Sequence, residues 1–155
     1  MSIYATNGAT IGICTTAQTA EPADASAYQA LTYVDIGEVE SLGAFGDTSN
    51  EVTFTAIDDA RVKKIKGARN AGNLELVCGI DYGDTGQAAL ITAEGTIFDY
   101  AFKVLFNDAP SGGTPSERYF LAKVMSASEQ LDSADNVMKL NATLGINTAV
   151  TRVDA

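Results

Sequence analysis

Alternating apolar and polar positions run through most of the chain and predict β-strands. The alternation is cleanest over residues 137–147, where Met138, Leu140, Ala142, Leu144 and Ile146 fall on one face. A side-chain period of two is typical of a strand with one buried face. The same pattern predicts strands over residues 9–16, 73–82 and 118–128.

Residues 33–59 predict two strands joined by a long connector. Residues 51–57 alternate strictly, residues 33–39 less regularly, and the Gly-rich residues 40–50 lie between them. A hairpin loop usually has about 2–5 residues, so this connector is too long for a tight turn. It is either a mobile surface loop or an arm that becomes ordered against a neighbouring subunit.

Residues 96–106 form a predicted strand that is apolar on both faces. One face carries Phe98, Tyr100, Phe102, Val104 and Phe106, and the other carries Ile97, Ala101 and Leu105. Such a strand needs cover on both sides. The domain core can cover one side, and the helix predicted at residues 84–94 or a partner subunit the other.

One helix is predicted between residues 84 and 94. Asp84 can cap its first turn, Gln87 follows three positions later as in a capping box, and Gly95 is a natural stop. We expect Ala88, Ile91 and Leu90 to dock it on the sheet. Residues 16–31 read as a long excursion with at most one helical turn, and residues 148–155 as a short tail.

These elements predict a mainly β fold. Seven or eight strands and one helix, without repeated βα alternation, indicate an antiparallel β-sandwich or small barrel with one flanking α-helix and a long hairpin loop. We expect a single domain over residues 9–150, with short terminal segments at 1–8 and 151–155.

The charge balance excludes some partners. The 155 residues carry 20 acidic and 10 basic side chains, a formal net charge of −10. This argues against tight binding to nucleic acids or anionic membranes. No signal-peptide pattern and no apolar stretch of about 20 residues occurs, so we expect no membrane anchor and folding in a cytosol.

Half of the basic residues lie in residues 58–69, where a helical turn and a short strand are both compatible with the sequence. The segment is either a solvated charged face or a patch that pairs with an acidic surface of another copy.

The residues offer little catalytic chemistry. The chain has no His, which removes His-dependent nucleophiles and His-ligated metals. Cys14 and Cys78 are 64 positions apart in strand-like runs and are expected to be buried, reduced thiols. Close acidic pairs, such as Asp81 with Asp84, fit turn and cap roles. We expect no catalytic residues, no cofactor and no metal.

The order of these features resembles the major tail tube protein of long-tailed, non-contractile bacteriophages. The resemblance lies in IGEVESLGAFGDTSNEVTFTAIDD, in KGARNAGNLELVCGIDYGDTGQAAL and in YFLAKVMSASEQLDSADNVMKLNATLGINT, and covers residues 9–150. It implies a virion structural protein, assembled in the host cytoplasm, that is not an enzyme. Six copies would close into a ring, and rings would stack into a tube that conducts DNA without binding it specifically.

The resemblance also implies partners and contacts. Partners would be further copies, a tape-measure protein, a tail-tip initiator and a tail terminator. Residues 52–57 would belong to the tube wall, and residues 40–50 would bridge rings. Faces rich in Thr and Asn could line the channel. The expected contact residues are Glu40, Ser41, Leu42, Gly43, Ala44, Phe45, Gly46, Asp47, Arg61, Lys63, Lys64, Lys66 and Arg69.

Two alternatives stay open. The chain could be a tube subunit of a contractile or secretion-system injection machine, or a monomeric β-barrel that binds a small apolar ligand. An enzyme is the third alternative and the least favoured, because the sequence contains no set of residues typical of a catalytic site.

Overall fold

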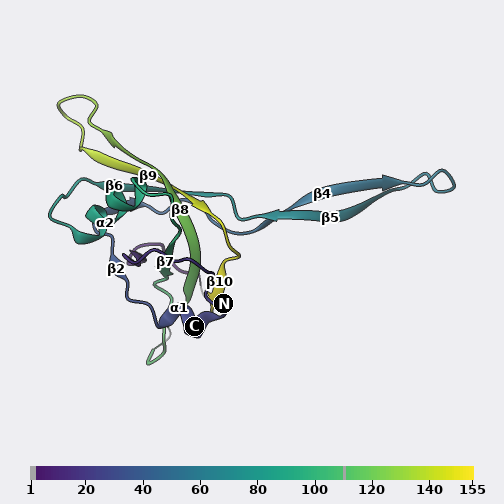
Figure 1. The fold of residues 1–155 in the computed structure, drawn as a ribbon, viewed down its shortest axis with the longest axis horizontal. Coiled ribbons are helices and arrows are strands. Elements are labelled where there is room, and N and C mark those ends of the chain that lie inside the picture. The colour runs from purple at the N-terminus through teal and green to yellow at the C-terminus, as the bar shows by residue number, and fades with distance from the viewer. Residues whose placement is uncertain (1–2, 110) are drawn as a thin grey trace.

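The computed structural model describes residues 3–109 and 111–155 as a compact body with one long arm projecting from it (Figure 1). The body is mainly β, as predicted. Its elements are β1 (Thr10–Ile13), α1 (Ala25–Gln29), β2 (Val34–Asp35), β3 (Val39–Ser41), β6 (Asn73–Gly79), α2 (Thr85–Glu94), β7 (Tyr100–Leu105), β8 (Glu117–Gln130), β9 (Lys139–Ile146) and β10 (Thr151–Val153). The arm consists of β4 (Thr48–Thr55) and β5 (Val62–Asn70).

The body is one curled antiparallel sheet of eight strands. Its order is β2-β1-β7-β8-β9-β6-β3, and β10 pairs with the start of β8. Strand β8 is 14 residues long and has a register shift between Val124 and Ser126, so it runs through both halves of the sheet. A bulge of this kind bends a strand and increases its twist. The two edge strands, β2 and β3, are separated by only three residues in the sequence, so the curl brings the sheet's edges to a seam at residues 36–38.

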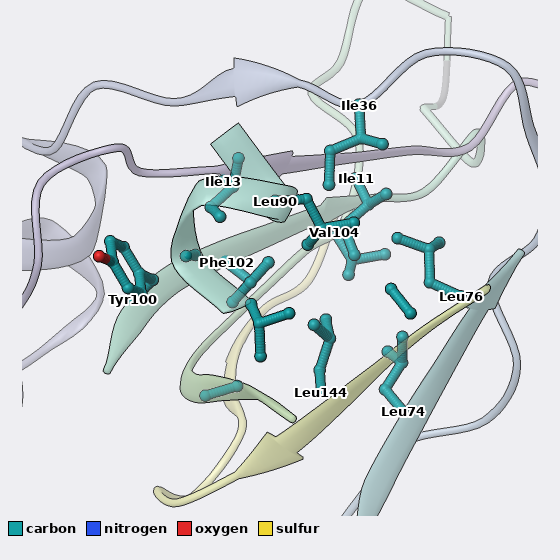
Figure 2. Close-up of a cluster of buried hydrophobic side chains, with 14 of the residues drawn as sticks. Ile11, Ile13, Ile36, Leu74, Leu76, Leu90, Tyr100, Phe102, Val104 and Leu144 are labelled. Atoms are coloured by element: carbon teal, nitrogen blue, oxygen red, sulfur yellow. The ribbon is translucent and has the colours of Figure 1, made fainter. Parts of the chain in front are cut away.

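The main core lies inside this curl (Figure 2). The alternation predicted for β6 and β9 is confirmed, because their apolar positions are buried and their polar positions are not. Leu74, Leu76 and Leu144 are fully buried beside Phe102 and Val104 of β7.

A second, smaller core covers the other face of β7. Ala101 is fully buried there among Tyr28, Tyr119 and Leu121. The rings of Tyr28 and Tyr119 stack with centroids 5.4 Å apart. The prediction that β7 needs cover on both faces is confirmed, but the predicted cover is wrong. The second face packs against α1 of the same chain, whereas the helix at residues 84–94 packs on the main core. Asp24 caps this short helix by accepting a hydrogen bond from the Ala27 amide, so the fold has two helices rather than one.

Helix α2 begins as predicted and docks differently. Asp84 accepts the Gln87 amide hydrogen bond at 2.9 Å and also accepts one from the amide of Gly37 in the seam. The Gln87 side chain does not return to the cap as a capping box would. It is fully buried and donates to the carbonyls of Gly37 and Gly79, so the start of α2 fastens the seam.

The predicted docking face of α2 is partly wrong. Leu90 is buried with Ala93, as expected for Leu90, but Ala88 and Ile91 are exposed. The helix is apolar on most sides, so its sequence marks the docking face only weakly.

Two strand boundaries also differ from the prediction. Strand β7 begins at Tyr100, and Ile97 and Phe98 are exposed in the loop before it. The predicted tail contains β10, which pairs with β8 through Thr151 and Tyr119. Arg118 of β8 holds this segment through a 2.9 Å ion pair with Asp154.

The predicted pairing within residues 33–59 is wrong. Residues 33–39 contain β2 and the start of β3, which lie at the two edges of the main sheet. The alternating residues 51–57 belong instead to the arm, where β4 pairs with β5. The basic segment is thus a strand, and the turn of the hairpin is at residues 56–61 rather than 40–50.

Candidate self-assembly surface

The arm is a two-stranded sheet that lies apart from the rest of the protein (Figure 1). Its register places Val52 opposite Ile65 and Thr53 opposite Lys64, with a shift between Ser49 and Glu51. Every residue of β4 is exposed, and every residue of β5 except Gly67 is exposed. The alternation in residues 51–57 predicts a half-buried strand, but no other part of residues 3–109 and 111–155 covers it.

The two faces of the arm differ in chemistry. Residues opposite one another in an antiparallel pair share a face, so Val52, Phe54 and Ile65 lie together on one face. About half of each of these side chains is exposed to solvent. Lys63 shares this face, opposite Phe54, while the other face carries Thr53, Thr55, Val62 and charged residues. One face is therefore an unpartnered apolar stripe.

All five basic residues of the predicted contact set at 61–69 lie on the arm. Three make exposed ion pairs within the chain: Lys63 with Asp59 at 3.5 Å, Lys64 with Glu51 at 3.6 Å and Arg69 with Asp47 at 3.2 Å. Exposed pairs of this kind contribute about 0–1 kcal/mol each to stability. Within residues 3–109 and 111–155, Arg61 and Lys66 make no ion pair, so the arm keeps positive charge available.

The other predicted contact residues, 40–47, form a strap that leads from β3 to the base of the arm. Glu40 pairs with Lys139 at 2.9 Å, and Leu42 and Phe45 pack on the main core. The Phe45 ring lies 6.0 Å from that of Phe120. Gly43 has a φ of 66° and lies against the Glu75 backbone, where a Cβ would be 2.6 Å from the carbonyl oxygen.

The strap corrects the prediction that residues 40–50 form a long hairpin loop. Ser41 ends β3, while Ala44 and Gly46 continue the strap. Asp47 meets Arg69 at the arm's base, where their side chains pair at 3.2 Å.

Sequence reasoning missed a second projection, the tip of the β8–β9 hairpin at residues 129–138, called the β8–β9 tip below. Leu131, Val137 and Met138 are each more than half exposed there. Its charged residues are all acidic: Glu129, Asp132 and Asp135. Glu129 also contacts Tyr82, and its hydrogen bond with the phenol raises the Tyr82 pKa. The signal in the sequence that could have revealed this projection was the presence of Leu131, Val137 and Met138 beside acidic residues around a predicted turn.

The outward face of β6, β9 and the second half of β8 is small and polar. The registers place Glu75 opposite Thr143, and Thr143 opposite Ser126. Neighbouring positions on this face are Asn73, Val77, Asn141 and Ser128. Hydroxyl and amide groups thus dominate a sheet face that no other element of the described chain covers.

Among residues 3–109 and 111–155, no group of three or more His, Cys, Asp or Glu residues is placed to hold a metal ion. No described helix is long and apolar enough to cross a membrane. A surface groove of about 370 Å³ lies between Tyr4, Leu42, Phe45 and Phe106, outside the packed interior.

Cys14 and Cys78 are both buried free thiols in the structure, and their burial was predicted from the sequence.

Known structures share this fold at low sequence identity. A chain of an extracellular contractile injection system, solved as the PVC sheath/tube terminator in its extended state, aligns with a TM-score of 0.70 and 11% identity, covering 99% of this chain and 98% of that one. A chain of the anti-feeding prophage baseplate aligns with a TM-score of 0.67 and 10% identity over the same shares. The SPP1 tail tube aligns with a TM-score of 0.61 and 12% identity, covering 95% of this chain and 77% of that one.

Neither a protein-family model nor a curated protein sequence matches the chain. The structural alignments, rather than a sequence match, show that the chain has the tail-tube fold, which phage tail tubes share with contractile injection systems. The similarity does not distinguish a non-contractile phage from a contractile machine.

Proposed function

We propose that the protein is a tube subunit whose copies associate into rings, and that these rings stack into a hollow tube. The observation that carries this proposal is the uncovered arm. A two-stranded hairpin is at best marginally stable in water, yet this one has strands of 8 and 9 residues and an exposed apolar face. A neighbouring copy would supply the missing cover.

Burying the exposed apolar side chains of the arm against a neighbouring copy would contribute substantially to the free energy of association. Full burial of a Val, Ile or Phe side chain is worth about 1.5–3 kcal/mol. Val52, Phe54 and Ile65 are 49%, 57% and 58% exposed. Covering them would contribute on the order of 1 kcal/mol each per contact, and a ring or tube repeats the contact at every subunit.

The polar outward face of β6, β8 and β9 is the proposed channel wall. Its hydroxyl and amide groups are hydrated and offer no cation to hold a phosphate. Glu75 contributes negative charge, and Lys139 at the end of β9 is paired with Glu40. DNA could then pass without specific binding. The main sheet thus replaces residues 52–57 as the proposed wall.

In its most specific form the proposal is a hexameric tail tube of a long-tailed, non-contractile phage. It would be a virion component assembled in the host cytoplasm with tape-measure, initiator and terminator proteins, and it would be structural rather than enzymatic. The fold similarity and the arm support a tube subunit.

A tube within a contractile injection system is the second candidate. The two highest of the TM-scores above belong to chains from such a system and from the anti-feeding prophage. A contractile machine surrounds its tube with a sheath, so binding of a sheath protein to assembled tubes would favour this candidate. Tubes that bind no sheath would favour the non-contractile phage.

Negative-stain electron microscopy of the concentrated protein tests the proposal. We expect rings or tubes for the wild type, and monomers for the variant Phe54→Ser with Ile65→Ser. The matched control, Thr53→Ser with Thr55→Ser on the opposite face, should assemble. Both variants should melt at the wild-type temperature, since the arm lies outside the core. A wild type that stays monomeric at high concentration would overturn the proposal.

A further inference from the structure

Charge is unevenly distributed between the arm and the rest of the chain. Residues 48–70 carry five basic and three acidic side chains, whereas the remaining residues carry five basic and seventeen acidic ones. The arm is thus a positively charged projection on a strongly acidic protein. Its charge would oppose binding to a positive surface and favour an acidic one.

The β8–β9 tip has the complementary character. It holds three acidic side chains and no basic one. All of residues 129–138 are exposed, including Leu131, Val137 and Met138. Tyr82, which is 60% exposed, lies beside it through the contact with Glu129. The tip therefore offers apolar side chains among acidic ones, as the arm offers apolar side chains among basic ones.

The arm and the tip project from opposite ends of the molecule (Figure 1). The arm emerges on the side where β6 begins, while the tip lies at the far end of β8 and β9. An arm therefore cannot reach the tip of its own copy. A contact between them joins two copies through different surfaces, and such a heterologous contact repeats to form a closed ring or an open filament.

We propose that the arm of one copy docks on the β8–β9 tip of a second copy. Arg61 at the turn of the arm and Lys63, which lies on the same face as the apolar stripe, opposite Phe54, face the carboxylates of Glu129 and Asp135. The exposed pair of Lys63 with Asp59 is weak and can be exchanged for this contact. The apolar stripe of Val52, Phe54 and Ile65 covers Leu131, Val137 and Met138. This inference rests on the proposed function and specifies the partner surface that the tube model leaves open.

Paired charge reversals test this contact. The arm variant carries Arg61→Glu with Lys63→Glu, and the tip variant carries Glu129→Lys with Asp135→Lys. Asp132 is left unchanged because its φ of 52° disfavours a Lys. Each variant alone places like charges at the contact. We therefore expect the protein concentration at which half of the subunits are assembled to rise at least tenfold. The control for the tip variant, Glu21→Lys with Glu94→Lys, makes the same change in net charge away from the tip and should assemble as the wild type does.

Mixing the two variants provides the decisive readout. The acidic arm of one variant can then dock on the basic tip of the other, and the native arm can dock on the native tip. We expect an equimolar mixture to assemble within threefold of the wild-type concentration, which also shows that both variants are folded. A mixture that stays monomeric while the control assembles would overturn the contact, as would a tip variant that assembles normally.

The two proposals fail in different ways. If the wild type assembles and the reversals have no effect, the docking partner is wrong and the tube function stands. If the wild type itself never assembles, the tube function is wrong and the docking contact falls with it.

Discussion

Gly86 of α2 lies directly against the backbone carbonyl of Asp35 in β2, with no room for a side chain between them. A Cβ on Gly86 would collide with that carbonyl oxygen and lie 2.7 Å from the Cα of Ile36. The close approach lets Asp84 and Gln87 reach the backbone of Gly37 in the seam.

The first prediction follows from this contact. Helix propensity alone favours Ala over Gly by about 1 kcal/mol, yet we expect Gly86→Ala to lower the free energy of unfolding by about 2–4 kcal/mol, because both clashing groups are backbone. Urea unfolding measures the difference. Gly95→Ala is the control, since its Cβ would meet only the Thr92 oxygen at 3.5 Å. An unchanged or more stable Gly86→Ala variant would show that α2 can move away from the seam.

The buried amide of Gln87 gives the second prediction. It donates to two carbonyls and accepts from the Asp81 amide at 3.1 Å. Gln87→Leu leaves these groups unsatisfied and should lower stability by about 2–4 kcal/mol. Gln87→Glu, which can still accept but cannot donate, should be destabilising too.

Thermal unfolding checks the Gln87 prediction. Gln29→Leu removes an exposed hydrogen bond to Glu117 and should change stability by less than about 0.5 kcal/mol. Equal losses from Gln29→Leu and Gln87→Leu would mean that the buried amide has no special role.

The third prediction concerns pH. Burial acts to raise the pKa of Asp99, but hydrogen bonds from Lys123 and Asn147, each 2.9 Å, lower it below the usual 3.8. A carboxyl with a depressed pKa stabilises the fold above its unfolded pKa, and loses that contribution as pH falls through the folded value. Asp99→Asn should therefore be less stable than the wild type at pH 7, by about 1 kcal/mol or less because Lys123 is partly exposed.

The difference between Asp99→Asn and the wild type should shrink below about pH 4, where the wild-type carboxyl gains its proton. Melting curves from pH 3 to pH 7 measure this. Glu94→Gln, exposed at the end of α2 and outside the proposed contact, should follow the wild type throughout. A gap between Asp99→Asn and the wild type that is constant with pH would rule out the ion pair as its cause.

The fourth prediction concerns the two thiols. Burial, with the nearby Asp84 charge, raises the pKa of Cys78 to about 11. Cys78 is fully buried and Cys14 is 3% exposed. Since the thiolate is the reactive form, a thiol reagent at pH 8 should label the folded protein at least a hundredfold more slowly than the denatured protein. Ser128→Cys adds an exposed thiol that should react at once, and equally rapid labelling of all three would contradict the packing.

The strands of the body could be predicted from the sequence because a strand with one buried face needs apolar residues at alternate positions. Leu74 and Leu76 in β6, and Leu140 and Leu144 in β9, alternate with polar residues since one face packs in the core. Asp84 marks the start of α2 through a local hydrogen bond with Gln87. Such short-range signals do not specify which strands pair.

The arm and the tip could not be placed by the same reasoning. Residues 33–39 and 51–57 are neighbours in sequence, but β4 pairs with β5 because the strap diverts the chain along the core through Leu42 and Phe45. In β5, Lys63, Lys64 and Lys66 interrupt the alternation of apolar and polar residues, so its sequence does not identify a strand. The exposure of residues 129–138 depends on how far β8 and β9 extend beyond the body, which is a tertiary property.

The seam at residues 36–38 has a consequence for how the chain folds. Only three residues join β2 to β3, so the sheet closes only when β2 has paired with β1 and β3 with β6, after the strands between them have assembled. Pairings between distant segments form slowly, because loop closure must come before the contacts that stabilise it. We expect closure of the seam by α2 to be the last step of folding, and the amide of Gly37 to exchange with solvent earlier than amides in the centre of β8.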